Sequence, residues 1–308
     1  MDMNLALFLT QLLNGVQLGL ILFLLSSGLT LVFGVLNFVN LAHGAFYMLG
    51  AFLTAAVALA TGSFLVGIVA AALLTAVLAA IVEGTIARAL YHRAHLEQVL
   101  ATFGLLLCAQ TAVHYLYGPS GLTVPLPDWL QGFVSLGAIT LPTYRLFIVV
   151  FGILLAIVLW FVMAKTRAGM IIRASATNRV MAESLGIETQ AVFTGLFGAG
   201  AVLAAIAGGL IAPITGASIN MGGPAVILAF VVIIIGGLGS VRGAFAAAMI
   251  VGLIDTLGRA YLTSVLATIF APKMASTAGP ALASILIYAI MAVVLAFKPE
   301  GLFPPASR

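Results

Sequence analysis

Charge is scarce in this sequence. Only 6% of its 308 residues are charged, whereas a soluble domain holds about 25%, so an ordinary soluble protein is excluded. The first lysine or arginine is Arg88, and because no positive charge precedes the first apolar run, no cleavable signal peptide is predicted. The single cysteine, Cys108, cannot form an internal disulfide. No basic run with interleaved aromatic residues is present, which argues against a nucleic-acid partner.

Apolar residues make up 63% of the chain. Continuous apolar runs of about 18 to 27 residues recur from end to end, which is typical of an all-α polytopic membrane protein in a lipid bilayer and not of a membrane barrel. We predict about ten membrane segments (eight to ten), some of them discontinuous, in a single transmembrane domain over residues 1–308. Their expected ranges are 5–25, 28–36, 44–61, 64–90, 97–117, 144–164, 191–212, 224–241, 244–262 and 280–297.

The second segment is too short to span a bilayer. Residues 28–36 reach only about 14 Å at a rise of 1.5 Å per residue, so they form either a half-helix or the end of a bent first span. Ten separate segments would leave the amino terminus inside the cell, whereas fusion of the first two would leave it outside.

Lysine and arginine are distributed unevenly between the predicted loops. If residues 91–96, residues 165–190 and the carboxyl terminus face the cytoplasm, nine of these residues lie on that side and three on the other, as the positive-inside rule expects. The cytoplasmic set is Arg88, Arg93, Lys165, Arg167, Arg173, Arg179, Arg242, Lys298 and Arg308, and the outer set is Arg145, Arg259 and Lys273.

Two longer stretches lie between membrane segments. The outer stretch, residues 118–143, is rich in proline and is either a platform at the membrane surface or an ordinary capped loop. The inner stretch, residues 165–190, has Asn178 as an N-cap candidate and Gly186 where a C-cap glycine belongs. These signals predict a short helix over residues 179–185, which must dock against something to be stable; the alternative is a plain positive-inside loop.

No Walker A phosphate-binding loop is present, because no lysine follows a glycine. The chain is therefore not expected to hydrolyse ATP. The run GGLGSVRG (236–243) contains the pair Gly239 and Gly243, and a second stripe of small residues is formed by Ala201, Ala205 and Gly209. Both stripes indicate close packing of membrane helices. No hydrolytic or redox constellation and no cofactor site is predicted.

Polar residues and glycines interrupt the apolar pattern at two places. The first is NFVNLAHGAFYMLGAF (37–52), with Asn37, Asn40, His43 and Gly44; the second holds Asn220, Gly222 and Gly223. Non-helical backbone at membrane depth is tolerated only where it is buried in protein or lines an aqueous cavity. Paired breaks in two halves of a chain point to an inverted repeat with a transport path at its junction. We therefore predict that these residues line a translocation path; a purely structural role in packing is the alternative.

Few ionisable residues fall within the membrane segments. His43 has no metal-ligand partners at suitable spacing, so we expect it to hold a helix start by hydrogen bonding. Asp255 and Arg259 are four residues apart, as in a helical ion pair, and form either a functional site or a self-neutralising pair. Glu83 and Arg88 are expected to extend toward the inner surface, and no role is assigned to Glu83.

Three stretches together resemble a known family. They are GLTLVFGVLNFVNLAHGAFYMLGAF, TRAGMIIRASATNRVMAESLGI followed by GLFGAGAVLAAIAGGL, and AFVVIIIGGLGSVRGAFAAAMIVGLID. They are similar to the permease subunits of branched-chain amino acid ABC importers, the LivH type, in order and over nearly the whole chain. Related permeases serve urea, amides and other small organic solutes, so the resemblance is less specific for the substrate.

The resemblance implies a permease domain in the bacterial cytoplasmic (inner) membrane, with partners. A second, similar permease, two ATPase subunits that bind ATP and Mg, and an extracytoplasmic binding protein would complete the importer. Residues 165–190 would be the segment that couples to the ATPases, through Arg173, Arg179, Glu183 and Gly186. Residues 118–143 would offer a docking surface to the binding protein. One rival interpretation is an ion-coupled secondary carrier. Another is a membrane enzyme, which is less favoured because no catalytic cluster is present.

Overall fold

The computed structural model describes residues 5–136 and 139–303, which are mostly helical. In chain order the elements are α1 (Leu5–Leu36), α2 (His43–Thr61), α3 (Phe64–Val82), the π-helix η1 (Glu83–Ala87), α4 (Arg88–Leu90), α5 (His95–Tyr117), the 3-10 helix η2 (Asp128–Leu130), β1 (Phe133–Leu136), β2 (Ile139–Pro142), α6 (Thr143–Lys165), α7 (Arg167–Thr177), α8 (Arg179–Ser184), α9 (Thr189–Thr215), the 3-10 helix η3 (Ile219–Met221), α10 (Gly222–Gly236), α11 (Val241–Leu266) and α12 (Pro272–Phe297).

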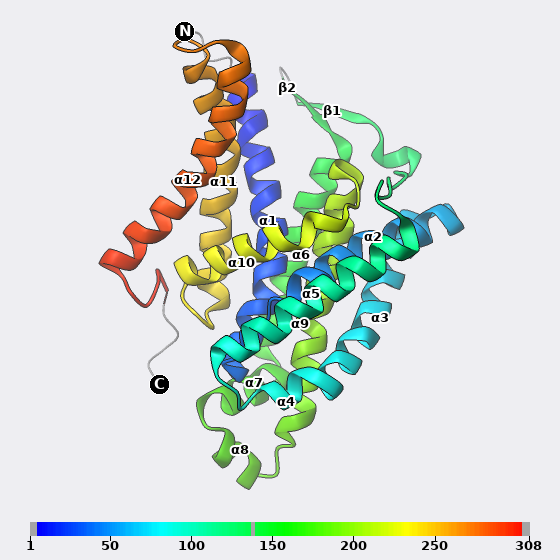
Figure 1. Ribbon diagram of the computed structural model, residues 1–308, viewed down its shortest axis with the longest axis vertical. Coiled ribbons are helices and arrows are strands. Elements are labelled where there is room, and N and C mark those ends of the chain that lie inside the picture. The colour runs from blue at the N-terminus through cyan, green and yellow to red at the C-terminus, as the bar shows by residue number, and fades with distance from the viewer. Residues whose placement is uncertain (1–4, 137–138, 304–308) are drawn as a thin grey trace.

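Nine helical segments among the described residues are long and apolar enough to cross a membrane, which confirms the predicted all-α polytopic class. The count is nine and not ten because residues 28–36 continue α1 without a break. The short segment is thus the end of the first span. Helix α1 begins at the end of the molecule opposite α7 and α8 (Figure 1). If α7 and α8 face the cytoplasm, as the sequence predicts, α1 begins on the outer side. Arg308 and residues 137–138 of the predicted outer stretch lie outside the described residues.

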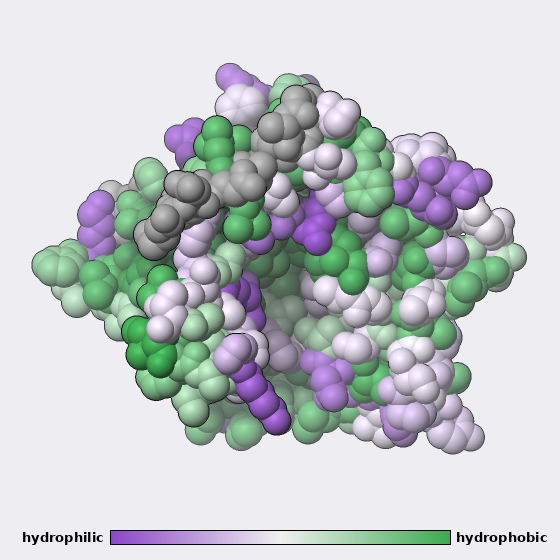
Figure 2. All heavy atoms as spheres, turned by 90° about the horizontal axis from the view of Figure 1, so that it is seen from above, coloured by the Kyte–Doolittle hydropathy of each residue, from purple (hydrophilic) through white to green (hydrophobic). Residues whose placement is uncertain are grey.

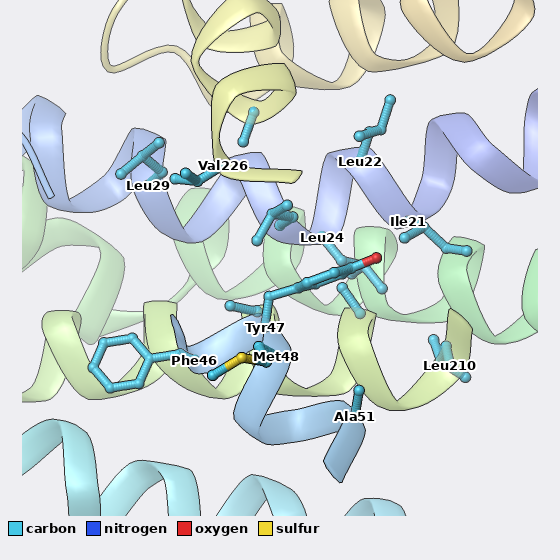
Figure 3. Packing of buried hydrophobic residues seen from close by; sticks show 14 of the residues in the cluster. Ile21, Leu22, Leu24, Leu29, Phe46, Tyr47, Met48, Ala51, Leu210 and Val226 are labelled. Atoms are coloured by element: carbon cyan, nitrogen blue, oxygen red, sulfur yellow. The ribbon is translucent and has the colours of Figure 1, made fainter. Parts of the chain in front are cut away.

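Helix α1 is the central helix. In its most apolar window 78% of the residues are buried, against 11% for both α6 and α12. Its buried side chains meet those of α2, α9 and α10: Figure 3 shows Ile21 and Leu24 of α1 beside the ring of Tyr47, with Leu210 and Val226 nearby. The most enclosed part of the membrane domain is therefore built around the helix that ends at the first break.

The central helices approach closely because glycines face their partners. A Cβ on Gly28 of α1 would lie 2.7 Å from the Cα of Gly200 on α9, and a Cβ on Gly208 of α9 would overlap the carbonyl oxygen of Tyr47. A Cβ on Gly50 of α2 would likewise overlap the backbone of Ala205, a member of the predicted small-residue stripe. In lipid there is little hydrophobic drive between helices, so such van der Waals contact carries their association.

Ordered structure replaces a loop in the outer stretch. Residues 118–143 contain η2 and the antiparallel hairpin β1–β2. Backbone hydrogen bonds of 3.0 and 2.8 Å tie Leu122 to Ala217, next to the second break. Trp129 packs edge-to-face on Phe147 of α6, with ring centroids 5.9 Å apart. The described residues of the stretch lie at the end opposite α7 and α8 (Figure 1), an arrangement that fits the platform alternative.

The inner stretch contains the predicted short helix and one that the sequence did not indicate. Helix α8 starts at Asn178, whose side chain accepts a hydrogen bond from the Met181 amide at 3.0 Å. Gly186 has a positive φ of 83°, as a C-cap glycine does. Before α8, helix α7 occupies residues for which no helix was predicted, and Thr166 caps its start.

The α2–α9 crossing gives a direct test of glycine packing. Gly208→Ala should destabilise the protein by about 1–3 kcal/mol because the added methyl group forces the helices apart. Gly198→Ala on the same helix is the control, since its Cβ would meet nothing within 4 Å and alanine raises helix propensity by about 1 kcal/mol. Thermal unfolding in detergent would measure both; equal midpoints would show that the crossing is not tight.

Candidate translocation pathway and coupling segment

The first break begins at Asn37. Its amide donates to the Phe33 carbonyl at 2.9 Å, and its φ of 50° turns the chain out of α1. Asparagine tolerates this left-handed conformation better than most residues. Residues 38–40 then run without helical hydrogen bonds until α2 begins at His43. Asn37 itself is exposed, whereas the neighbouring Phe38 and Asn40 are buried.

Two side chains of α5 satisfy the backbone of this break. The Gln98 Oε1 accepts from the Val39 amide at 3.1 Å, and the Thr102 Oγ1 accepts from the Leu41 amide at 3.1 Å. The Gln98 amide nitrogen also donates to the carbonyls of Leu90 and Arg93. Both side chains are 1% exposed. Sequence reasoning missed them, because a lone Gln and Thr in an apolar helix carry no local sign of a partner about sixty residues away.

His43 fixes the start of α2 against α1. Its Nε2 lies 2.9 Å from the Leu25 carbonyl oxygen, and the side chain is buried. A Cβ on Gly28 would lie 2.9 Å from the imidazole, so the ring fills the space that this glycine leaves. The hydrogen bond fits the expected holding role. Asn40 is also buried, and in the described part of the chain its Oδ1 accepts no hydrogen bond.

The second break meets the first at a glycine contact. A Cβ on Gly44 would overlap the carbonyl oxygen of Gly222, and the reverse also holds. The start of α2 thus packs directly on the start of α10. Gly223 has open space where its Cβ would be, and Asn220 is exposed. The structure therefore brings Asn40, His43, Gly44 and Gly222 into the packed interior and leaves Asn37, Asn220 and Gly223 accessible.

A hollow opens at the end of the molecule that carries the hairpin β1–β2. Figure 2 shows it near the middle of that face, with hydrophobic side chains in its depth and hydrophilic ones along its rim. Helix α10 lies transverse to α1 across the middle of the molecule (Figure 1). The hollow thus presents an apolar surface at this end of the molecule.

The charged residues that were predicted to couple to the ATPases lie in two separate places. Arg179 and Glu183 of α8 form an ion pair at 2.8 Å, and Glu183 also accepts from the Thr189 hydroxyl at 2.5 Å. These hydrogen bonds, first from Thr189 and then from Arg179, lower the pKa of Glu183. Arg173 lies apart from them: it donates to the Met163 carbonyl and lines a cavity of about 810 Å³ that Arg242 also lines.

The tip of α8 carries exposed apolar side chains, which sequence reasoning did not single out. Val180, Met181 and Leu185 are 73%, 58% and 75% exposed. Helix α8 projects from the end of the molecule (Figure 1). Apolar side chains grouped on a projecting polar segment are typical of a protein-binding surface.

Glu83 does not extend to the surface, contrary to expectation. Its side chain is fully buried in η1 and forms an ion pair of 2.9 Å with Arg88. It also accepts hydrogen bonds from the hydroxyls of Tyr91 and Thr194, at 3.1 and 2.8 Å. Of this pair only Arg88 is partly exposed. The π-helix, which the apolar pattern does not reveal, helps place the carboxylate inside the protein.

Asp255 and Arg259 pair as their spacing predicts. The guanidinium of Arg259 lies 2.8 Å from the carboxylate of Asp255, and it reaches the Ser284 hydroxyl of α12 at 3.4 Å. These contacts fit the self-neutralising alternative, and they tie α11 to α12.

Comparison with known proteins identifies the family. The family described as "Branched-chain amino acid transport system / permease component" matches residues 11–295. The chain belongs to this family. The branched-chain amino acid permease protein LivH of Escherichia coli (strain K12) is 30% identical over 271 residues, which cover 83% of this chain and 88% of the relative. BraD of Pseudomonas aeruginosa, another high-affinity branched-chain amino acid permease protein, is 26% identical over 308 residues, covering 96% and 95%. No solved structure matches this permease.

Gln98 gives a test of the first break. Gln98→Leu should lower the free energy of unfolding by about 1–3 kcal/mol for each backbone group left without its partner. Gln110→Leu, at a half-buried position of the same helix, is the matched control. Thermal unfolding in detergent measures both variants. If the two variants unfold together, Gln98 does not support the break.

Proposed function

We propose that this permease is the membrane subunit of an ATP-driven ABC importer that takes up leucine, isoleucine and valine in the bacterial cytoplasmic membrane. It works with a second, homologous permease and two ATPase subunits that bind ATP and Mg. An extracytoplasmic binding protein delivers the amino acid to the outer end. The chain itself is a translocation subunit, and hydrolysis takes place on its partners.

The observation that carries this proposal is the form of α8. A helix of six residues is not stable alone in water, yet α8 is capped at both ends and presents Val180, Met181 and Leu185 to solvent. Such a segment fits a groove on a partner protein, where burial of these side chains would contribute about 25 cal/mol per Å² of apolar surface. An ATPase subunit at this end would move α8 as it closes on ATP.

The proposed path runs from the hollow of Figure 2 to the two breaks. Its apolar depth suits the aliphatic side chain of a branched-chain amino acid, and the exposed amide of Asn220 offers a hydrogen bond to its polar end. The packed contact between Gly44 and Gly222 closes the way at this level. Transport requires the two helix starts to separate, and a path that binds its solute too tightly cannot release it.

Reconstitution tests the proposal. The chain is placed in proteoliposomes alone, and then with its partner permease, ATPases and binding protein. Uptake of radiolabelled leucine should need the full complex and ATP. Uptake by the chain alone on an ion gradient would show a secondary carrier, and ATP-driven uptake of urea or an amide in place of leucine would correct the substrate.

The tip of α8 gives the coupling test. Met181→Glu places a charge in the proposed contact and should lower binding-protein-stimulated ATP hydrolysis about tenfold, since burying an unpaired charge is costly. Met274→Glu, at a residue of α12 with nearly equal exposure of 57%, is the control and should leave hydrolysis unchanged. Normal hydrolysis in the Met181 variant, with normal assembly, would refute the docking role.

The polar residues of the breaks give the path test. Asn220→Leu should lower leucine uptake while the complex still assembles, because the exposed amide is lost without disturbing packed contacts. Asn40→Leu changes a buried residue and should lower both uptake and stability. Uptake at the normal rate in the Asn220 variant would leave that residue a structural role alone.

A further inference from the structure

The buried carboxylate of Glu83 takes no part in the proposed translocation path. It lies where α3 gives way to the π-helical turn η1, a kind of local distortion found frequently at functional sites. Its oxygens bind Arg88 and Tyr91 of its own region and Thr194 of α9. Thr194 follows shortly after α8 in the chain. The carboxylate therefore joins the end of the third span to the helix that leaves the coupling segment.

Tyr91 stands between this carboxylate and the first break. Its hydroxyl donates to Glu83, and burial raises its pKa, so the proton stays on the phenol. Its ring packs edge-to-face on two phenylalanines: Phe193 of α9, with centroids 6.3 Å apart, and Phe38, with centroids 5.2 Å apart. Phe38 is fully buried, and it directly precedes Val39, whose amide is held by Gln98.

The coupling helix reaches the same ring system. The guanidinium of Arg179 lies over the ring of Phe193, 4.9 Å from its centroid. Arg179 is held in place by Glu183, one helical turn along α8. A continuous series of contacts thus runs from α8 through Phe193 and Tyr91 to Phe38 and the end of α1.

We propose that Tyr91, anchored by Glu83, is a positioning residue that transmits movement of α8 to the break between α1 and α2. The inference rests on the proposed function and names the route by which the ATPases would act on the path. When a partner pulls α8, the ring of Phe193 moves with Arg179, and Tyr91 carries the displacement to Phe38. Packed rings suit this role because a well-packed interior transmits strain.

The test measures leucine taken up per ATP hydrolysed in the reconstituted complex. Tyr91→Leu removes both ring contacts and should lower this ratio about fivefold, while basal hydrolysis and assembly persist. Tyr91→Phe keeps the ring and loses only the hydroxyl on Glu83, so it should retain most of the ratio. Tyr117→Leu, on α5, is the matched control. It removes a comparable ring contact, with Phe52 of α2 at a centroid distance of 5.3 Å, and should leave the ratio unchanged.

A double substitution separates transmission from general destabilisation. Phe38→Leu acts at the other end of the series and should reproduce the loss seen in Tyr91→Leu. The two together should lower the ratio no further, since each already interrupts the same route. Multiplied losses, or an unchanged ratio in Tyr91→Leu, would overturn the route while leaving the importer intact. Failure of the unaltered complex to import leucine on ATP would instead overturn the proposed function, and the route with it.

Discussion

The structure depends on supplying hydrogen-bond partners to the main-chain groups that are left free where a membrane helix is interrupted. Hydrocarbon offers no hydrogen bonds, so every amide freed by the interruption of α1 must find a partner within the protein. Gln98 and Thr102 provide partners for the amides of Val39 and Leu41, and in doing so they fix α5 beside the first break. The same constraint explains why His43 is buried yet hydrogen-bonded to a main-chain carbonyl.

Glycine contacts and hydrogen-bonded polar side chains stabilise this structure in different ways. Contacts such as that between Gly44 and Gly222 bring the helices close enough for the two breaks to meet. These van der Waals contacts are not directional, unlike hydrogen bonds. The directed interactions are the hydrogen bonds of Gln98, Thr102 and His43 at the first break and those by which Glu83 gathers Arg88, Tyr91 and Thr194. The glycine contacts thus set how closely the helices approach, and the hydrogen-bonded side chains fix which groups face one another.

Local signals in the sequence predicted local structure well. Segment lengths indicated the spans, and Asn178 and Gly186 marked α8 because capping depends on neighbouring residues. Both breaks were visible, but their contact joins Gly44 to Gly222, and no local pattern reports such a pairing. Gln98 was missed, and the burial of Glu83 was predicted wrongly, for the same reason: their partners lie far along the chain or follow a π-helical turn. Helix α7 was missed because its arginines and short polar residues are equally common in loops.

The exposed apolar tip of α8 also bears on how a cell must produce this protein. Without the proposed ATPase subunit, the permease leaves Val180, Met181 and Leu185 exposed, and exposed apolar side chains of this kind promote aggregation. If the proposed ATPase subunit covers this surface, production of the permease has to be matched to production of that subunit, because surplus chains would keep the apolar side chains exposed.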